Sequence, residues 1–119
     1  MVSDITKQTL ATVAHHLEAV MSGDIDAVLS DYSEESICFT PEGPVRGLQQ
    51  IRSGFEAMVS NMPPGMTDAM EMIQQDAEGE VAYLFWKAEP FVSLGTDTFI
   101  VRNGKIVVQT YAMSMPSNS

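Results

Sequence analysis

The spacing of hydrophobic residues changes once along this chain, near residue 65. Before that point, apolar residues return every three or four positions, which is the spacing of one face of an α-helix. After it, apolar and polar residues come close to alternating, as they do in strands. The sequence Pro63-Pro64-Gly65 separates the two parts and is typical of a helix end. The change predicts helices in the first half and a sheet in the second.

Three helices are predicted before the change. The first covers residues 6–22 and has its apolar face centred near Leu17. Gly23 is typical of the end of a helix, and Asp24 is typical of the residue that caps the start of the next one. That second helix is short, and a third follows over about residues 48–61. The first apolar face consists of Leu10, Val13, Ala14, Leu17, Val20 and Met21.

One short strand is predicted at residues 37–40, closed by a turn over 41–44. Four longer strands are expected at about residues 67–75, 80–88, 94–102 and 105–115, followed by a frayed tail at 116–119. Asn103-Gly104 predicts an antiparallel hairpin between the last two strands. We therefore expect one α+β domain over residues 1–119, in which a curved antiparallel sheet wraps round three N-terminal helices as a cone. A small ligand would sit in the open mouth of that cone.

Charge and composition exclude several classes of protein. The chain has 119 residues with 6 Lys and Arg against 16 Asp and Glu, for a net charge of −10, which argues against nucleic acid and membrane surfaces as partners. A single cysteine, Cys38, excludes an internal disulfide and a cysteine-based zinc site. The N-terminus lacks the apolar run of a signal peptide, and no segment has the roughly 20 apolar residues that cross a bilayer. We expect a cytoplasmic protein that uses no metal and no cofactor.

Several short motifs occur in an order that resembles a known superfamily. These are SGDIDAV at residues 22–28, YSEE at 32–35, TPEG at 40–43 and Arg46-Gly47. The order is similar to that of the nuclear-transport-factor-2-like superfamily, and closest to its SnoaL-like polyketide cyclase and steroid delta-isomerase branch. The resemblance covers about residues 10–113. It implies the cone fold and a homodimer formed through the sheet.

The same resemblance maps functional residues onto this chain. In steroid isomerases, the general base is an Asp just before the proline that ends the first strand, and Thr40 stands at that position here. A threonine hydroxyl does not titrate in a useful range, so we do not expect steroid isomerisation by that route. The oxyanion-donating Tyr corresponds to His16, its supporting Tyr to Phe55, and the second donor, a buried acid, to Asp97.

The spacing of residues independently favours His16 and Asp97. His16 lies about 100° from the centre of the first helix's apolar face, whereas His15 points outward. Alternation places Asp97 on the same side of its strand as Phe99 and Val101. If both face the cavity, they form a His–Asp acid/base couple, or a protonated Asp97 and His16 together polarise a carbonyl. Otherwise His16 is a boundary residue hydrogen-bonded to a neighbour or to water, and Asp97 is an exposed acid at a strand end.

Other candidate residues have two interpretations each. Cys38 shares a strand face with Thr40 and is either a small buried thiol or part of the cavity. Trp86, Tyr83 and Tyr111 either pack in the core or an interface, or line the pocket. The 9 methionines are core filler, or they form a pocket for an apolar ligand of irregular shape. The residues expected at the ligand pocket are Thr40, Phe55, Cys38, Phe99, Tyr111 and Met113.

The leading hypothesis is a SnoaL-like enzyme that acts on a small hydrophobic compound bearing a carbonyl group. Isomerisation, cyclisation or hydration would proceed by general acid/base chemistry, with His16 and Asp97 as the catalytic candidates. The alternative is a non-catalytic module of the same fold that binds a small ligand or dimerises, because this fold serves both purposes. Thr40 at the position of the base favours this alternative.

Overall fold

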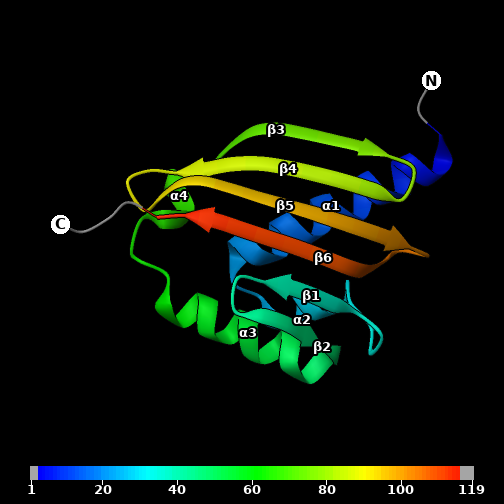
Figure 1. The fold of residues 1–119 in the computed structure, drawn as a ribbon, viewed down its shortest axis with the longest axis horizontal. Coiled ribbons are helices and arrows are strands. Elements are labelled where there is room, and N and C mark those ends of the chain that lie inside the picture. Colours follow the sequence, from blue (N-terminus) through cyan, green and yellow to red (C-terminus); the bar gives the residue numbers. More distant parts are fainter. Residues whose placement is uncertain (1–2, 116–119) are drawn as a thin grey trace.

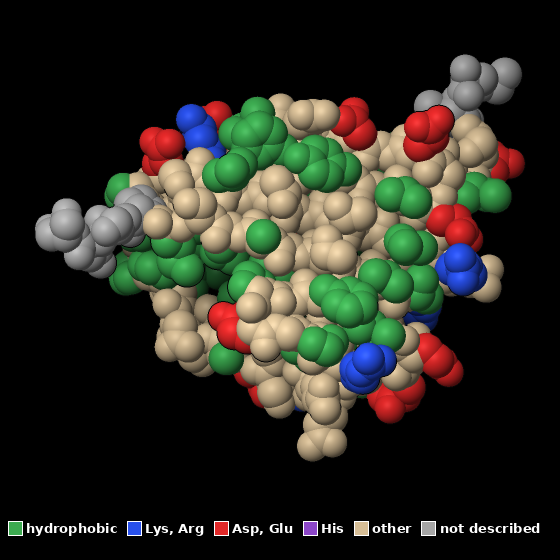
Figure 2. All heavy atoms as spheres, in the orientation of Figure 1, with side chains coloured by type: hydrophobic (Ala, Val, Ile, Leu, Met, Phe, Trp, Pro, Cys, Tyr) green, Lys and Arg blue, Asp and Glu red, His purple; other side chains and the backbone are tan. Residues whose placement is uncertain are grey.

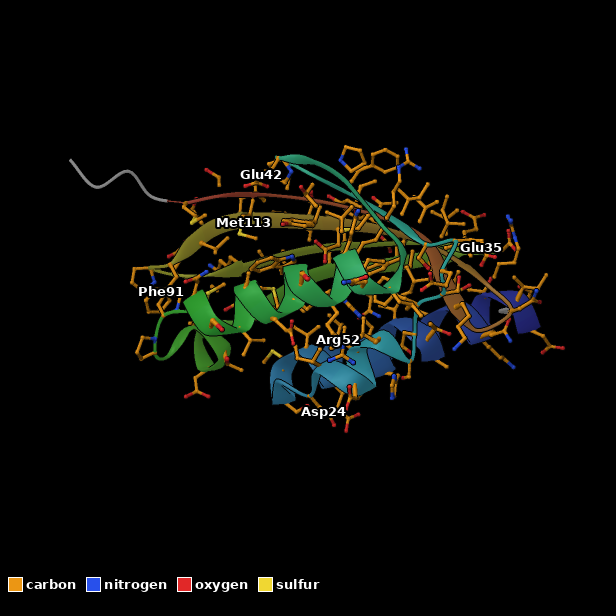
Figure 3. The ribbon with its side chains drawn as sticks, turned by 90° about the horizontal axis from the view of Figure 1, so that it is seen from below. Asp24, Glu35, Glu42, Arg52, Phe91 and Met113 are labelled. Carbon is orange, nitrogen blue, oxygen red and sulfur yellow. The ribbon has the colours of Figure 1, made fainter. Side chains whose placement is uncertain are left out.

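Helices cover one side of a six-stranded curved sheet (Figure 1). The computed structural model describes residues 3–115, so the predicted frayed tail at 116–119 lies outside the described residues. A view turned by 90° shows the helices as one layer and the sheet as another (Figure 3). None of the described helices is long and apolar enough to cross a membrane. In chain order the elements are α1 (Asp4–Ser22), α2 (Ile25–Leu29), β1 (Ile37–Thr40), β2 (Gly43–Arg46), α3 (Gly47–Asn61), α4 (Met66–Ala69), β3 (Glu71–Glu78), β4 (Val81–Ala88), β5 (Val92–Arg102) and β6 (Lys105–Ser114).

The strands lie side by side in the order β2-β1-β6-β5-β4-β3. β3 to β6 form a continuous antiparallel run, as the alternating sequence predicts. Asn103 and Gly104 join the last two strands with positive φ angles of 54° and 74°, which is the geometry of a two-residue hairpin turn. β1 lies parallel to β6 and antiparallel to β2, so the sheet is mixed rather than antiparallel throughout. The predicted α+β class and the curved sheet over N-terminal helices are confirmed, with this one parallel pair as a correction.

The sequence did not predict two short elements, β2 and α4. β2 begins inside the predicted turn and contains Pro44, which lacks a backbone N–H; the sheet accepts it because β2 is an edge strand. α4 occupies the start of the segment predicted as a strand over residues 67–75, and β3 begins only at Glu71. Gly65, with φ of 88°, turns the chain into α4. Such a four-residue helix is too short to show a period of its own.

The buried face of α1 carries threonine and histidine as well as apolar residues. The spacing predicts a face centred on Leu17, but Leu17 is only half-buried. Thr9 donates its hydroxyl to the carbonyl of Gly79 at 2.7 Å, and the Gly79 N–H donates to the Thr6 hydroxyl at 2.9 Å. These bonds satisfy hydroxyls that would otherwise be costly to bury. The buried face of α1 is therefore centred near His16, whereas the spacing predicts a centre near Leu17. The buried residues of α1 are Thr6, Thr9, Thr12, Val13, His16 and Ala19.

The core runs along the inner face of the sheet, from Ile106 beside the β5–β6 turn to Ala88 and Val92 beside the β4–β5 turn. Leu84, Phe99 and Ile106 on the inner face of the sheet are fully enclosed, and Val13 of α1 belongs to the same cluster. On the helical side, Arg52 of α3 lies 2.7 Å from a carboxylate oxygen on Asp26 of α2, and it points toward α2 in Figure 3. The core leaves a space between this face of the sheet and the helices α3 and α4, where a site can form.

A buried hydrogen bond ties the turn after α2 to the sheet. The Tyr32 hydroxyl donates to the side-chain oxygen of Gln109 on β6, and both residues are buried. Burial raises the pKa of Tyr32, so its phenol keeps the proton that it donates.

Replacing Tyr32 should therefore destabilise the fold through one unsatisfied polar group. We expect Tyr32→Phe to lower the free energy of unfolding by about 1–3 kcal/mol, because the Gln109 oxygen is left buried without its donor. The matched control is Tyr83→Phe on the outer face of the sheet, with an expected change within about 0.5 kcal/mol. Urea unfolding of the three proteins measures both values. Equal stability of Tyr32→Phe and the wild type would contradict the structural role of this bond.

Candidate functional site

A cavity of about 190 Å³ opens between the helices and the inner face of the sheet. α1, α3 and α4 form its helical wall, and residues from all six strands form the wall opposite. Much of its surface consists of methionine side chains, whose flexible thioethers adapt to irregular apolar ligands. These residues are Met58, Met62, Met66, Met70, Met72 and Met113.

Polar groups gather on the sheet side of the cavity, around Asp97. Asp97 stands on the inner face of β5, with Leu84 of β4 and Tyr111 of β6 as its partners in register. Burial raises the pKa of the Asp97 carboxyl to about 6, and an interaction with the Trp86 indole N–H partly offsets that rise. The carboxyl group therefore changes its protonation state close to neutral pH.

Two neighbours of Asp97 stay protonated at neutral pH. Burial raises the pKa of Tyr111, with further contributions from the negative charges of Glu42 and Asp97 and from the Cys38 sulfur when it is ionised. Burial and the Asp97 charge also raise the pKa of the Cys38 thiol to about 11. Because the thiolate is the reactive form of cysteine, Cys38 is a neutral wall residue and not a nucleophile.

His16 lies on the helical side, enclosed by aromatic rings. Only 3% of the residue is exposed, and the rings of Tyr32, Phe55 and Phe99 meet its imidazole edge-on at centroid distances of 5.8, 5.8 and 5.3 Å. Burial and the neighbouring His15 lower the pKa of His16 to about 4, so the ring is neutral at pH 7. Its Nδ1 atom is buried and has no hydrogen-bond partner among the described residues.

The two catalytic candidates share the cavity without forming a pair. Among the described residues, no hydrogen bond joins His16 to Asp97, although both line the cavity. The histidine that does bind a carboxylate is the half-exposed His15, whose Nδ1 lies 2.7 Å from an oxygen of the buried Asp31. Asp31 stands in a turn with no periodic pattern around it, so the sequence does not indicate this pairing. No described group of three or more His, Cys, Asp or Glu is arranged to hold a metal ion.

The expected pocket residues divide into two groups. Phe55, Cys38, Tyr111 and Met113 line the cavity together with His16 and Asp97. Thr40 and Phe99 are not part of the lining that the described residues form.

Thr40 and Phe99 have structural roles away from the cavity surface. The Thr40 hydroxyl donates to the Gly43 carbonyl at 2.8 Å and accepts from the Glu42 N–H at 3.1 Å, so it shapes the β1–β2 turn. Phe99 is fully buried behind the His16 ring.

Two further lining residues stand on the sheet: Gln109, which the sequence did not indicate, and Trp86, for which the sequence left core, interface and pocket open. Gln109 lies on β6 opposite Cys38 of β1, and Trp86 lies on β4. The alternation of β4 indicates that Trp86 shares a face with Leu84, but it does not indicate whether that face meets the core or a cavity. For Gln109 the sequence carries no signal, because a polar residue in a strand is most often exposed.

A helix-covered curved sheet with a cavity at its open end defines the class of this protein. The class comprises NTF2-like α+β domains, whose fold supports small-molecule-binding or isomerase-type modules. Residues 13–109 match the SnoaL-like domain, which is most of the chain. The chain therefore belongs to the SnoaL-like domain family. No curated protein matches it in sequence.

Solved structures share this fold at low sequence identity. An NTF2-like protein of unknown function from Mesorhizobium loti has a TM-score of 0.78 and 19% identity, with 96% of this chain and 97% of that chain covered. A SnoaL-like protein of unknown function from Burkholderia thailandensis has a TM-score of 0.72 and 17% identity, covering 95% and 98%. A protein from Kribbella flavida named as a candidate ketosteroid isomerase has a TM-score of 0.72 and 14% identity, covering 96% and 83%. At these identities the likeness establishes the fold and not the chemistry.

The buried His16 predicts a specific response of stability to acid. Its pKa of about 4 in the folded protein lies below the ordinary value of 6.5, so the unfolded chain binds the proton more tightly. His16 should therefore subtract from stability as the pH falls from 6.5 toward 4, by roughly 3 kcal/mol at most. His16→Phe lacks this proton-binding group, so its stability relative to the wild type should rise over the same range. Urea unfolding at several pH values measures the difference.

The neighbouring histidine provides the control for this measurement. The carboxylate of Asp31 raises the pKa of His15, so the stability that His15 adds is present in acid and is lost as the pH rises through its folded pKa. His15→Gln should therefore lose stability relative to the wild type in acid, the reverse of His16→Phe. A constant difference between His16→Phe and the wild type from pH 4 to 7 would contradict a neutral, buried His16.

Proposed function

We propose that this protein binds a small, neutral, mostly apolar compound with one carbonyl group and moves a proton on the carbon beside that carbonyl. Asp97 carries the proposal, because it is the titratable carboxyl group in the wall of a largely apolar cavity. A pKa of about 6 lets Asp97 accept a proton and return it near neutral pH, which is what a general base requires. The proposal is of the isomerase type that this family's fold supports.

The size and lining of the cavity support a ligand of about one substituted ring. The cavity measures about 190 Å³, and an apolar cavity of about 150 Å³ holds a benzene molecule. Thioether sulfurs make favourable contacts with aromatic rings, and six methionines are available here. A small aromatic ketone such as acetophenone therefore matches the cavity in size and polarity.

The proposed step needs one base and one hydrogen-bond donor. The proton leaves the carbon beside the carbonyl and bonds to an Asp97 oxygen, while the C–H electron pair forms a carbon–carbon double bond and the carbonyl π pair moves to the oxygen. Tyr111 lies opposite Asp97 in register and keeps its proton, so its hydroxyl can donate to that oxygen. Return of the proton completes the cycle with no net oxidation. His16 adds a neutral imidazole to the opposite wall.

Deuterium exchange tests this step directly. With acetophenone in D2O, we expect the wild type to accelerate exchange of the methyl protons over buffer, with a rate that rises with pH through about 6 as Asp97 ionises. Asp97→Asn should lower the exchange rate by about 100-fold or more, because the amide cannot accept the proton. Asp68→Asn, at an exposed acid of α4, should leave the rate unchanged. NMR spectroscopy of the ligand measures the exchange.

The same experiment separates the enzyme from the binding module. Absence of a hydrogen bond between His16 and Asp97 in the described residues favours binding without catalysis as the second candidate, since neither group orients the other. Acetophenone that binds without any acceleration of exchange would support that candidate and overturn the proposed reaction. Native mass spectrometry of the purified protein adds the mass of any compound that it retains.

We also propose that two copies pair through the outer face of the sheet. On this face, Val81, Ile100, Val108 and Ile37 form a continuous row across β4, β5, β6 and β1 through their partners in register. Figure 2 views the sheet side, where hydrophobic and uncharged side chains occupy the middle and charged ones lie mostly around the margin. An interface core is depleted in charge in the same way.

Placing a charge within this row should separate the copies. Val108→Lys buries an unpaired ammonium group at the centre of the proposed interface, so we expect a shift from dimer to monomer in light scattering coupled to size-exclusion chromatography. Val81→Lys is the second variant, because Val81 is 46% exposed in the single chain and tolerates a charge there. Ile5→Lys, at a residue of α1 that is 55% exposed, is the control that should remain a dimer. A monomeric wild type would overturn the proposal.

A further inference from the structure

Trp86 lies against Gly95 on the neighbouring strand. The two residues are partners in register on β4 and β5. A Cβ atom at position 95 would stand 2.4 Å from Cε2 and 2.5 Å from Cζ2 of the Trp86 indole, which is closer than atoms can approach. No side chain larger than hydrogen fits at position 95 while the indole keeps this place. Glycine is therefore needed at position 95 to let the Trp86 side chain pack against the β5 backbone, and not to form a turn.

This contact brings the indole to the proposed base. Asp97 follows Gly95 by two residues, so alternation puts both on the inner face of β5. Trp86 and Asp97 belong to alternate cross-strand pairs on the inner face, Trp86 with Gly95 and Leu84 with Asp97, and both side chains line the cavity. Burial raises the pKa of Asp97, and the proximity of Trp86 lowers it in part. Trp86 is largely buried, which keeps water from competing for the same carboxylate.

We propose that Trp86, seated on Gly95, is a positioning residue that holds the Asp97 carboxylate toward the cavity by donating its indole N–H. Its importance for turnover rests on the proposed function, but the contact itself does not. An indole N–H is a donor only, and it bonds more strongly to an ionised carboxylate than to the carbonyl oxygen of the protonated acid. Trp86 thus favours the form of Asp97 that accepts a proton.

Other titratable groups around this cavity change their charge at other pH values. Tyr111 on β6 and Tyr32 ahead of β1 have raised pKa values, and the pKa of Cys38 on β1 is about 11. The pKa of His16 on α1 is about 4. The described residues of α3 and α4 contribute no titratable group to the lining. A titration with a midpoint near pH 6 in this cavity therefore belongs to Asp97.

The chain contains a single tryptophan, so its indole N–H gives one unambiguous resonance. In the ligand-free, ¹⁵N-labelled protein, we expect this resonance to shift with a midpoint near pH 6, and we expect Asp97→Asn to abolish that shift. An indole resonance that does not respond between pH 5 and 7 in the folded wild type would overturn the proposal. This readout needs no ligand, so its failure is distinct from failure of the proposed reaction.

Two variants test the roles of the Trp86 indole N–H and of Gly95, on which the indole packs. Trp86→Phe keeps an aromatic ring but removes the N–H, so the pKa of Asp97, followed by carboxyl ¹³C NMR, should rise by about one unit. Gly95→Ala keeps the indole but displaces it, and should raise the same pKa. Phe85→Leu, on the outer face of β4, is the control that should leave it unchanged.

The pH profile of acetophenone exchange extends the test to turnover. Its midpoint should move upward with the Asp97 pKa in Trp86→Phe and should stay in place in Phe85→Leu. A merely structural role for Trp86 would lower stability without moving either midpoint. An unchanged Asp97 pKa in both Trp86→Phe and Gly95→Ala would therefore overturn the proposal.

Discussion

Alternation along β5 is the constraint on which the rest of the structure depends. It puts Gly95, Asp97 and Phe99 on one face of the strand, so the same face must provide both core and cavity wall. α1 covers the Phe99 end and makes it fully buried. α3 and α4 cover the other end less closely and leave about 190 Å³ open beside Asp97. The positions of α1, α3 and α4 along β5 thus decide which of its inward-facing residues pack in the core and which line the cavity.

Desolvation then gives the cavity its chemistry. The same apolar surroundings raise the pKa of Asp97 to about 6 and lower that of His16 to about 4, because burial penalises whichever form carries charge. Both groups are consequently neutral in mild acid, and only Asp97 changes its state near neutral pH. The two shifts act on stability in opposite directions. Between pH 4 and 6, a rise in pH strengthens the fold through His16 and weakens it through Asp97.

Much of the fold follows from the sequence pattern, and the exceptions have physical causes. Long periodic elements such as α1 and the antiparallel run from β3 to β6 are set by local spacing and by the Asn103-Gly104 turn. The parallel pairing of β1 with β6 joins segments far apart in the chain, which no local pattern encodes. On α1, the buried face includes Thr6 and Thr9 because a distant turn at Gly79 satisfies their hydroxyls. The spacing of apolar residues alone predicts that the buried face of α1 is centred near Leu17, where the helix is in fact only half-buried.

The sequence by itself determined that His16 and Asp97 are unusual for their positions, since a polar residue beside an apolar face needs a reason to be there. Only the tertiary structure decided that they share a cavity without bonding to each other, and that His15 pairs with Asp31 instead. It also brought Trp86 onto Gly95 next to the Asp97 carboxylate. Proton affinity and hydrogen bonding depend on which atoms other strands and helices bring within a few ångströms. Spacing along one chain segment fixes the face of a residue but not those neighbours.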